Sequence, residues 1–161
     1  MLRRLDLALL RLLLTRGHQP PIQQLVLAYT RAGEHGVLWH LVAATGALAR
    51  PREREVFVRA FRVVALAYGA NIAVKYFVRR LRPVVEDLPA LSPTVTSLSF
   101  PSAHATTSFA AAAALREALP AAPLYAGATA MALSRVYAGV HYPTDVAAGA
   151  AFGTALERLL P

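Results

Sequence analysis

Long segments that are apolar on nearly every side, separated by short basic turns, limit what this chain can fold into. The clearest is VFVRAFRVVALAYGANIAVKYFV at 56–78, which is long enough to cross a bilayer. Hydrophobic residues make up 56% of the 161 positions, and the mean hydropathy is +0.42. Helices that are apolar all round are buried in protein or in lipid, and so short a chain can bury few of them by itself. We therefore expect a membrane protein, with a soluble all-α bundle built on an alanine-rich core as the alternative.

The excess of positive charge limits the kinds of partner that the chain can bind. Lys and Arg number 17 against 9 Asp and Glu, which gives a net charge of +8. Basic ends and loops around apolar segments suit an anionic lipid surface. Nucleic acid is not expected as a partner, because the arginines interrupt hydrophobic segments and form no polar binding face. The chain has no cysteine, which excludes disulfides, thiolate catalysis and cysteine metal sites.

The first segment, 1–17, reads MLRRLDLALLRLLLTRG and has the basic start and leucine run of a signal peptide. Asp6 and Arg11 interrupt the run, however, and no small-residue cleavage site follows. Its leucines recur at helical spacing among several arginines. The leucines are Leu2, Leu5, Leu9, Leu12 and Leu13, and the arginines are Arg3, Arg4, Arg11 and Arg16. This pattern predicts an amphipathic helix that lies in the membrane interface.

Prolines and charged turns divide the remainder of the chain into further apolar helices. The expected helical segments are 22–49, 56–78, 102–119, 124–140 and 146–160. Small residues on one face of the last segment suit close helix packing in lipid. We expect one all-α domain over 1–161, a multi-pass membrane helix bundle of about five transmembrane helices behind the interfacial helix. Trp39 and Tyr142 fit interfacial anchors of such a bundle.

If these helices cross the membrane alternately, three polar clusters fall on the same side. The stretch 75–82 ends the second crossing, and 101–104 begins the third. The stretch 134–145 connects the fourth crossing to the fifth. We therefore expect these distant parts of the chain to meet at one membrane face.

The cations in these clusters suit a multiply charged oxyanion. Lys75 and Arg82 are seven residues apart, two helical turns, and so share a helix face. Arg135 supplies a third fixed cation, and arginine can bind phosphate oxygens in a bidentate manner. Ser102 and the backbone N–H groups at the start of its helix add neutral donors. Without an anion these cations would repel one another, so the cluster predicts a phosphate-like ligand.

Two histidines add the parts of a phosphoryl transfer. His141 and Asp145, at i and i+4, can meet on one helical turn, so that the carboxylate holds the imidazole in one tautomer. Such an imidazole is a good nucleophile toward phosphorus. His104, on another helix, could protonate the leaving oxygen.

The three clusters resemble, in order and spacing, the signature of the type-2 phosphatidic acid phosphatase family, which shares its site with vanadium haloperoxidases. The matching residues are Lys75 to Arg82-Pro83, then Pro101-Ser102-Ala103-His104, then Ser134-Arg135 through His141 to Asp145. One such motif would be weak evidence, but three in order over about 70 residues are specific.

The chain departs from the family's pattern at Ala103, where the family has glycine. Alanine would be strained if the backbone there needed a positive φ, and is tolerable if it only begins a helix, which we expect.

The resemblance implies a metal-independent lipid phosphatase that needs no cofactor. His141 would form a phosphohistidine, Asp145 would orient it, and His104 would protonate the leaving group. Five residues would hold the phosphoryl oxygens: Lys75, Arg82, Ser102, Ala103 and Arg135.

Among lipid substrates, the compact chain resembles short bacterial members that act on polyprenyl diphosphates or polyprenyl-phosphoryl sugar phosphates. Phosphatidic acid and phosphatidylglycerol phosphate are the close alternatives. A vanadate-dependent haloperoxidase fits the hydropathy less well, and an inactive lipid-binding relative is suggested only by Ala103.

The expected location is the plasma (inner) membrane. Arginines in 1–17 favour a cytoplasmic start and so a cytoplasm-facing site, although Arg50, Arg52 and Arg54 on the opposite side reduce this bias. Arg79 and Arg80 fit flanking charges that contact headgroups. The sequence gives no indication of an oligomeric partner.

Overall fold

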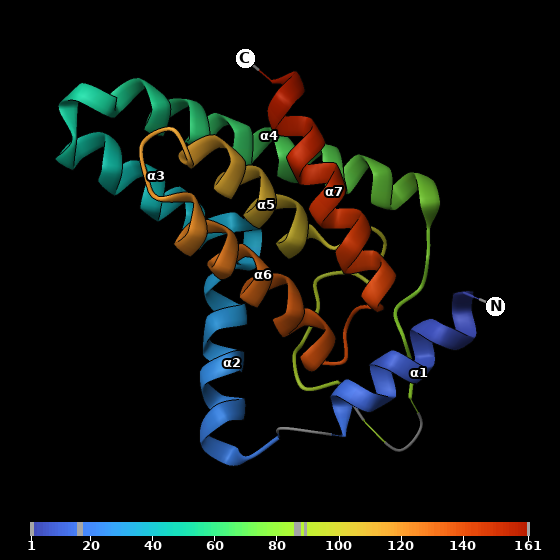
Figure 1. Cartoon of the computed structure of the whole chain (residues 1–161). Coiled ribbons are helices and arrows are strands. Elements are labelled where there is room, and N and C mark those ends of the chain that lie inside the picture. Colours follow the sequence, from blue (N-terminus) through green and yellow to red (C-terminus); the bar gives the residue numbers. More distant parts are fainter. Residues whose placement is uncertain (1, 16–17, 86–87, 89, 161) are drawn as a thin grey trace.

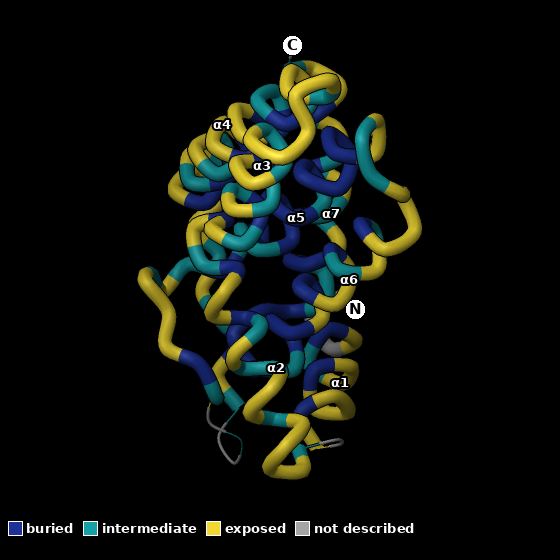
Figure 2. Tube along the Cα trace, turned by 90° about the vertical axis from the view of Figure 1, so that its left-hand side faces the viewer, coloured by how far each residue is buried: buried dark blue, intermediate teal, exposed yellow. Residues whose placement is uncertain are grey.

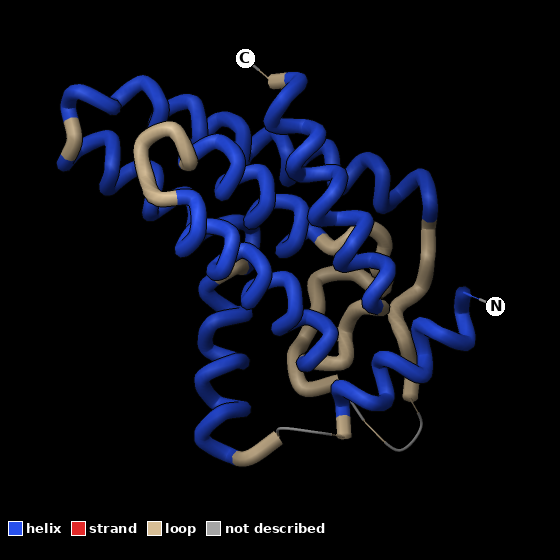
Figure 3. The backbone as a smooth tube through the Cα atoms, in the orientation of Figure 1, coloured by secondary structure: helices blue, strands red, loops and turns tan. Residues whose placement is uncertain are grey.

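The computed structural model describes residues 2–15, 18–85, 88 and 90–160, and no described residue lies in a strand beyond one isolated bridge (Figures 1 and 3). The all-α class is therefore confirmed. In chain order, the α-helices are α1 (Leu2–Leu14), α2 (Pro20–Ala32), α3 (Val37–Ala49), α4 (Arg54–Val78), α5 (Ala103–Leu115), α6 (Ala121–Tyr137) and α7 (Pro143–Leu159). Two 3-10 turns precede α3 and α4, at Glu34–Gly36 and Pro51–Glu53.

Helix α5 is the centre of the bundle, with α4, α6 and α7 packed around it (Figure 1). Apart from Phe109, every residue from Ala105 to Leu115 is buried, and Figure 2 shows the helix in the interior. Helix α5 is thus one of the few helices that so short a chain can bury by itself. Alanine side chains let three neighbours approach closely enough to cover it. The helix also ends at Leu115, before the predicted position 119, and at about 20 Å it is shorter than a hydrocarbon core of about 30 Å.

Glycines on α7 bring its backbone against α5. A Cβ atom at Gly149 would lie 2.6 Å from the Ser102 carbonyl oxygen, and one at Gly153 would overlap the Thr106 carbonyl. The small-residue face predicted for the last helix is therefore the face that packs on α5.

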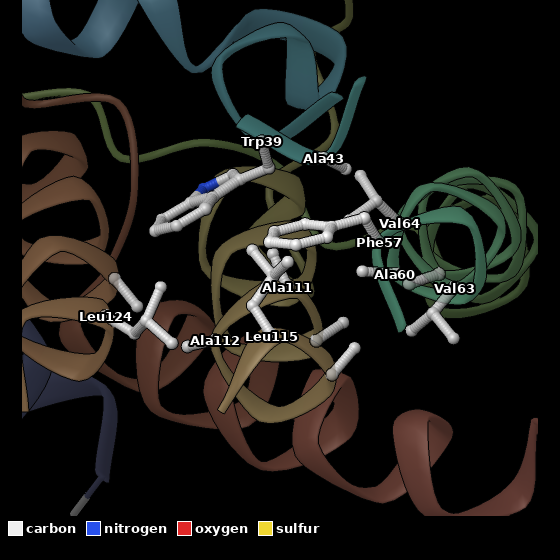
Figure 4. Packing of buried hydrophobic residues seen from close by; sticks show 14 residues of the cluster. Trp39, Ala43, Phe57, Ala60, Val63, Val64, Ala111, Ala112, Leu115 and Leu124 are labelled. Carbon is white, nitrogen blue, oxygen red and sulfur yellow. The ribbon is translucent and has the colours of Figure 1, made fainter. Parts of the chain in front are cut away.

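The largest hydrophobic cluster lies between α3, α4 and α5 (Figure 4). Trp39 and Phe57 pack there against Ala111 and Leu115. The Trp39 indole Nε1 donates a hydrogen bond to Ser108 Oγ at 2.7 Å, and the side chain is 5% exposed. The expectation that Trp39 anchors at the membrane interface is wrong, because its polar N–H group has a partner inside the protein.

The segment 22–49, predicted as one crossing, is broken into α2 and α3, which point in different directions (Figure 1). His35 and Gly36 between them adopt left-handed conformations, with φ of 53° and 74°. An α-helix cannot pass through two such residues, so the chain turns at this point.

Helix α1 is amphipathic. Leu10 and Leu14 are buried against the bundle, whereas Leu5, Leu9, Leu12 and Leu13 are between 42% and 52% exposed. Arg16 and the side chains of Leu2, Arg3 and Arg4 lie outside the described residues. Among the described helices, the stretch Pro51–Val78 is long and apolar enough by composition to cross a membrane.

The carboxyl ends of α4 and α6 and the amino ends of α5 and α7 lie at the same side of the bundle, beside the long loop 79–102 (Figures 1 and 3). A bridge between Leu81 and Leu98 ties the two arms of this loop together. Arg82 N donates to Ser97 O at 3.0 Å, and Ser99 N donates to Arg80 O at 2.7 Å. This pairing brings the residues after α4 beside the start of α5.

Candidate active site

A cavity of about 200 Å³ opens where these helix ends meet. Six of the residues predicted for the site line it: Lys75, Arg82, Ala103, His104, Arg135 and His141. Ser102 and Asp145 lie behind this lining and are fully buried. The structure thus brings all three sequence clusters to one place.

Arg82 is held by two backbone carbonyls. Its Nε donates to Thr96 O at 2.8 Å, and its Nη1 donates to Val140 O at 2.7 Å. Burial lowers the pKa of Arg82 to about 10, which still leaves the guanidinium charged at neutral pH. The side chain therefore presents a fixed positive charge to the cavity.

Lys75 binds the loop that leads into α5. Its Nζ donates to the carbonyl oxygens of Leu98, Ser99 and Pro101 at 3.3, 3.2 and 3.0 Å. An ammonium group has three donors, so Lys75 has to release one of these carbonyls to bind an anion. It both shapes the loop and carries charge at the cavity.

Thr30, on α2, contacts three side chains at the site. Its Oγ1 accepts hydrogen bonds from Arg135 Nη1 at 2.8 Å and from Ser134 Oγ at 2.9 Å. Its carbonyl oxygen lies 3.0 Å from His104 Nε2. Because a carbonyl can only accept, Nε2 of His104 carries a proton and Nδ1 is left for other partners. Arg135 Nε, also buried, has no partner among the described residues.

The contacts of His141 define its tautomer. Its Nε2 lies 3.0 Å from Arg82 Nη1, which can only donate, and its Nδ1 lies 3.4 Å from Asp145 Oδ2. The proton therefore belongs on Nδ1, and the lone pair is on Nε2, the nitrogen that meets the cavity cation. Burial, followed by the charges of Arg82, Arg135 and Lys75, lowers the pKa of His141 well below its ordinary value. The imidazole is neutral at neutral pH.

Gly139 positions this histidine after α6. It adopts a left-handed conformation, with φ of 73°, that a residue with a side chain rarely enters. The turn lets Val140 N donate back to Arg135 O at 3.2 Å and directs the chain toward α7.

Both carboxylate oxygens of Asp145 accept hydrogen bonds. The backbone N–H of Tyr142 donates to Oδ2 at 2.9 Å, so the carboxylate also caps α7. Arg80 Nη1 donates to Oδ1 at 2.8 Å, and its guanidinium stacks over the Tyr142 ring at 4.0 Å. The expectation that Arg80 contacts headgroups is wrong, because its charge is used inside the protein. Tyr142 is 7% exposed and is not an interfacial anchor.

Arg80 also links Asp145 to the first helix. Its Nη2 donates to Asp6 Oδ2 at 2.8 Å, and Thr144 N donates to Asp6 Oδ1 at 3.1 Å. Burial alone would raise the pKa of Asp6, but hydrogen bonds from Thr144 and Arg80 offset this and hold that pKa below its usual range. A charged Asp6 therefore joins α1 to the start of α7.

Ser102 and Ala103 begin α5. Ser102 N donates to Asp145 O at 3.0 Å, and Ser102 Oγ, fully buried, has no hydrogen-bond partner among the described residues. Ala103 is the first residue of α5. Among described non-glycine residues only His35 and Arg79 have positive φ, so alanine at 103 is not strained by the backbone.

Sequence reasoning missed Thr30, Asp6 and Arg80 as parts of this site. Asp6 carried a signal, since an acidic residue inside a leucine-rich helix calls for a partner, but the sequence did not indicate which one. Arg80 is one of three arginines in RRLR, and Thr30 is one threonine in an apolar segment. Only the fold selects them.

An all-helical bundle that gathers two imidazoles and three cations around one cavity defines a class, the helical enzymes that act on phosphate esters. The PAP2 superfamily matches residues 57–161, which is more than half of the chain. The chain belongs to the PAP2 superfamily, and the resemblance drawn from its motifs is confirmed.

Two named relatives are phosphatases. The decaprenylphosphoryl-5-phosphoribose phosphatase of Mycolicibacterium smegmatis is 44% identical over 76% of this chain and 68% of the relative. The phosphatase of the same name from Mycobacterium tuberculosis strain H37Rv is 41% identical over 80% of this chain and 72% of the relative. These relatives confirm the predicted class of enzyme, a phosphatase of the lipid phosphatase family.

Two solved structures share the fold. LpxE of Aquifex aeolicus superposes with a TM-score of 0.80 at 26% identity, covering 96% of this chain and 93% of that one. A transmembrane PAP2-type phosphatidylglycerolphosphate phosphatase from Bacillus subtilis gives a TM-score of 0.77 at 24% identity, covering 99% and 84%. At that identity the second likeness concerns the fold alone.

Proposed function

We propose that this enzyme hydrolyses the phosphate monoester of a polyprenyl-phosphoryl sugar phosphate and releases inorganic phosphate. The observation that carries the proposal is the one cavity that joins both imidazoles to the cations of Lys75, Arg82 and Arg135. The names of the relatives supply the substrate class. Their substrate is a lipid phosphate attached to a ribose that carries a second phosphate at its position 5.

His141 is the nucleophile in this proposal. Its Nε2 lone pair attacks phosphorus, and the bond between phosphorus and the sugar oxygen breaks. In the structure Arg82 donates to Nε2 at 3.0 Å. An arriving phosphate offers Arg82 a charged acceptor, which frees the lone pair for attack. Asp145 holds the Nδ1 proton and stabilises the positive charge that the ring acquires.

His104 is the general acid for the leaving group. Its Nε2–H stays with Thr30 O. The proton for the sugar oxygen therefore comes from Nδ1, which is protonated when the negative charge of the bound phosphate stabilises the doubly protonated ring. The neutral His104 left after this step then takes a proton from water. That water attacks phosphorus, the bond to His141 breaks, and inorganic phosphate leaves.

The remaining predicted residues bind the phosphoryl oxygens. Lys75, Arg82 and Arg135 oppose the three negative oxygens, and the amino end of α5 at Ala103 adds N–H groups and a positive dipole end. The unpartnered Ser102 hydroxyl and Arg135 Nε are the donors with capacity to spare. These donors are fixed before the substrate arrives, which favours stabilisation of the transition state.

In the membrane, we propose that α3 to α7 form about five crossings of the plasma membrane within one domain over 1–161. The short helices α3 and α5 cross together with the turns at their ends. The exposed leucines of α1 suit a helix in the interface, and Asp6 ties this helix to the site end of the bundle. The arginines near α1 favour a cytoplasm-facing site.

The test is phosphate release from purified protein in detergent, measured with a panel of lipid phosphates. The panel contains a polyprenyl-phosphoryl ribose phosphate, a polyprenyl diphosphate, phosphatidic acid and phosphatidylglycerol phosphate. We expect the highest kcat/KM on the sugar phosphate, lost on His141→Gln and retained in the matched control His40→Gln on α3. A preference for another lipid contradicts the substrate assignment, and release that survives His141→Gln contradicts the mechanism.

A further inference from the structure

The cavity has a second wall that the phosphate chemistry does not use. Its residues come from the turn between α2 and α3, from the middle of α4 and from the loop before α5. Its polar members are Glu34, His35, Tyr68, Tyr76, Thr94 and Thr96. One cavity therefore combines a cluster of cations with hydroxyl, imidazole and carboxylate side chains.

Glu34 is out of place in a simple phosphate site. Its carboxylate lines the same cavity as Arg135 and acts on that guanidinium through its charge, but it forms no hydrogen bond with a described side chain. A carboxylate repels a phosphate dianion, so a site for phosphate alone gains nothing from it. A carboxylate does accept hydrogen bonds from the hydroxyls of a ribose, as in dinucleotide sites.

The backbone that presents Glu34 is held in an unusual conformation. His35 adopts φ 53° and ψ 16°, a left-handed geometry that is uncommon for a residue with a side chain. His35 Nδ1 lies 2.6 Å from the Tyr68 hydroxyl on α4. A Cβ at Gly36 would lie 2.9 Å from Val64 and 3.5 Å from Thr107, so the turn is packed against α4 and α5. Such conformations persist where the surrounding structure fixes them, and they cluster at binding sites.

We infer that Glu34, with the His35–Tyr68 pair, binds the ring hydroxyls of the sugar that carries the scissile phosphate. This inference rests on the proposed function and names the part of the substrate that the second wall reads. In a sugar 5-phosphate the ring lies next to the phosphate, so a phosphate held by the cations brings the ring within reach of the other side chains that line the same small cavity. Phosphatidic acid, whose other glycerol oxygens are esterified, offers no hydroxyl to Glu34.

The experiment compares two matched substrates, a short-chain polyprenyl-phosphoryl ribose 5-phosphate and its 2,3-dideoxy analogue. Wild-type enzyme is expected to lose about tenfold to a hundredfold in kcat/KM on the analogue, the effect of losing a hydrogen bond to a charged group. In Glu34→Gln the ratio between the two substrates is expected to fall at least tenfold toward unity. The control Glu55→Gln, an exposed acid at the start of α4, retains the wild-type ratio.

Each possible result of this experiment supports or overturns the inference. If Glu34→Gln lowers kcat/KM on both substrates by the same factor, Glu34 only positions Arg135 and the inference is overturned. If wild-type enzyme treats both substrates alike, nothing reads the hydroxyls, although the proposed function stands. If wild-type enzyme does not release phosphate from the ribose lipid at all, the proposed function fails and the inference fails with it. Tyr68→Phe, which removes a single hydroxyl, gives the same comparison should Glu34→Gln not fold.

Discussion

Arg80 binds Asp145 through the carboxylate oxygen that His141 does not use. Arg80 Nη1 lies 2.8 Å from Oδ1, whereas His141 Nδ1 lies 3.4 Å from Oδ2. The same guanidinium reaches Asp6 on α1 at 2.8 Å. The first helix is therefore connected to the predicted nucleophile through two ion pairs, although the chain separates them by more than a hundred residues.

Arg80→Gln should destabilise the enzyme, because it leaves Asp6 and Asp145 buried without their cation. Breaking such a pair from one side costs on the order of 3 kcal/mol. The neighbouring Arg79→Gln is the matched control, since Arg79 is exposed and the change in charge is the same. Thermal melting in detergent measures both. Equal melting temperatures for the two variants would show that the Arg80 pairs contribute little.

Thr30→Val should impair catalysis without changing the fold. The substitution keeps the shape of the side chain and removes the hydroxyl that accepts from Arg135, while the carbonyl that meets His104 remains. A hydrogen bond to a charged group corresponds to about a tenfold to hundredfold change, and kcat/KM should fall by that factor. Thr154→Val is the control, because the Thr154 hydroxyl bonds only within its own helix. Full activity of Thr30→Val would mean that Arg135 needs no anchor on α2.

Acidification should destabilise the protein through His141. The pKa of His141 is lowered by burial, so between that value and about 6.5 the unfolded chain binds a proton that the folded protein does not. Stability is therefore expected to fall as the pH drops below about 6.5. The slope of melting temperature against pH in this range should be smaller in His141→Gln than in wild type. Identical slopes would indicate that His141 has an ordinary pKa in the folded state.

Gly153→Ala should loosen the contact of α7 with α5. A Cβ there overlaps the Thr106 carbonyl, which cannot move without disturbing the buried central helix. Overpacking of this kind costs about 1–3 kcal/mol. Gly69→Ala on α4 is the control, because a Cβ at that position meets nothing within 4 Å. In an exposed helix this change is expected to stabilise by roughly 0.5–1 kcal/mol. A Gly153→Ala variant as stable as Gly69→Ala would contradict the close packing.

The sequence predicted the helical class, the family and the meeting of three distant clusters, because motif spacing and helix alternation are both local properties. It failed where a residue's environment depends on the neighbours that the fold supplies. Trp39 and Tyr142 carry the amphipathic side chains of membrane anchors, yet the Trp39 N–H binds Ser108 and the Tyr142 ring packs under Arg80, both inside the protein. Arg79 and Arg80 have the same local sequence context, and only the fold, which places Asp6 and Asp145 beside Arg80, distinguishes them.

The sequence did not indicate which helix lies at the centre of the bundle, for a related reason. Helix α5 is as apolar as its neighbours, so hydropathy alone cannot separate a helix covered by lipid from one covered by other helices. The break between α2 and α3 was also missed. GEHG contains two glycines, which is a turn signal, but the apolar residues on either side suggested one continuous segment.

The most direct test of the central claim is a search for the covalent intermediate. Purified enzyme is mixed with the ribose phosphate lipid, quenched rapidly under alkaline conditions that preserve a phosphorus–nitrogen bond, and digested for mass spectrometry. The account predicts a phosphoryl group on the peptide that contains His141, present in wild type and absent in His141→Gln. Phosphate release without any phosphorylated His141, or with the label on another residue, would contradict it.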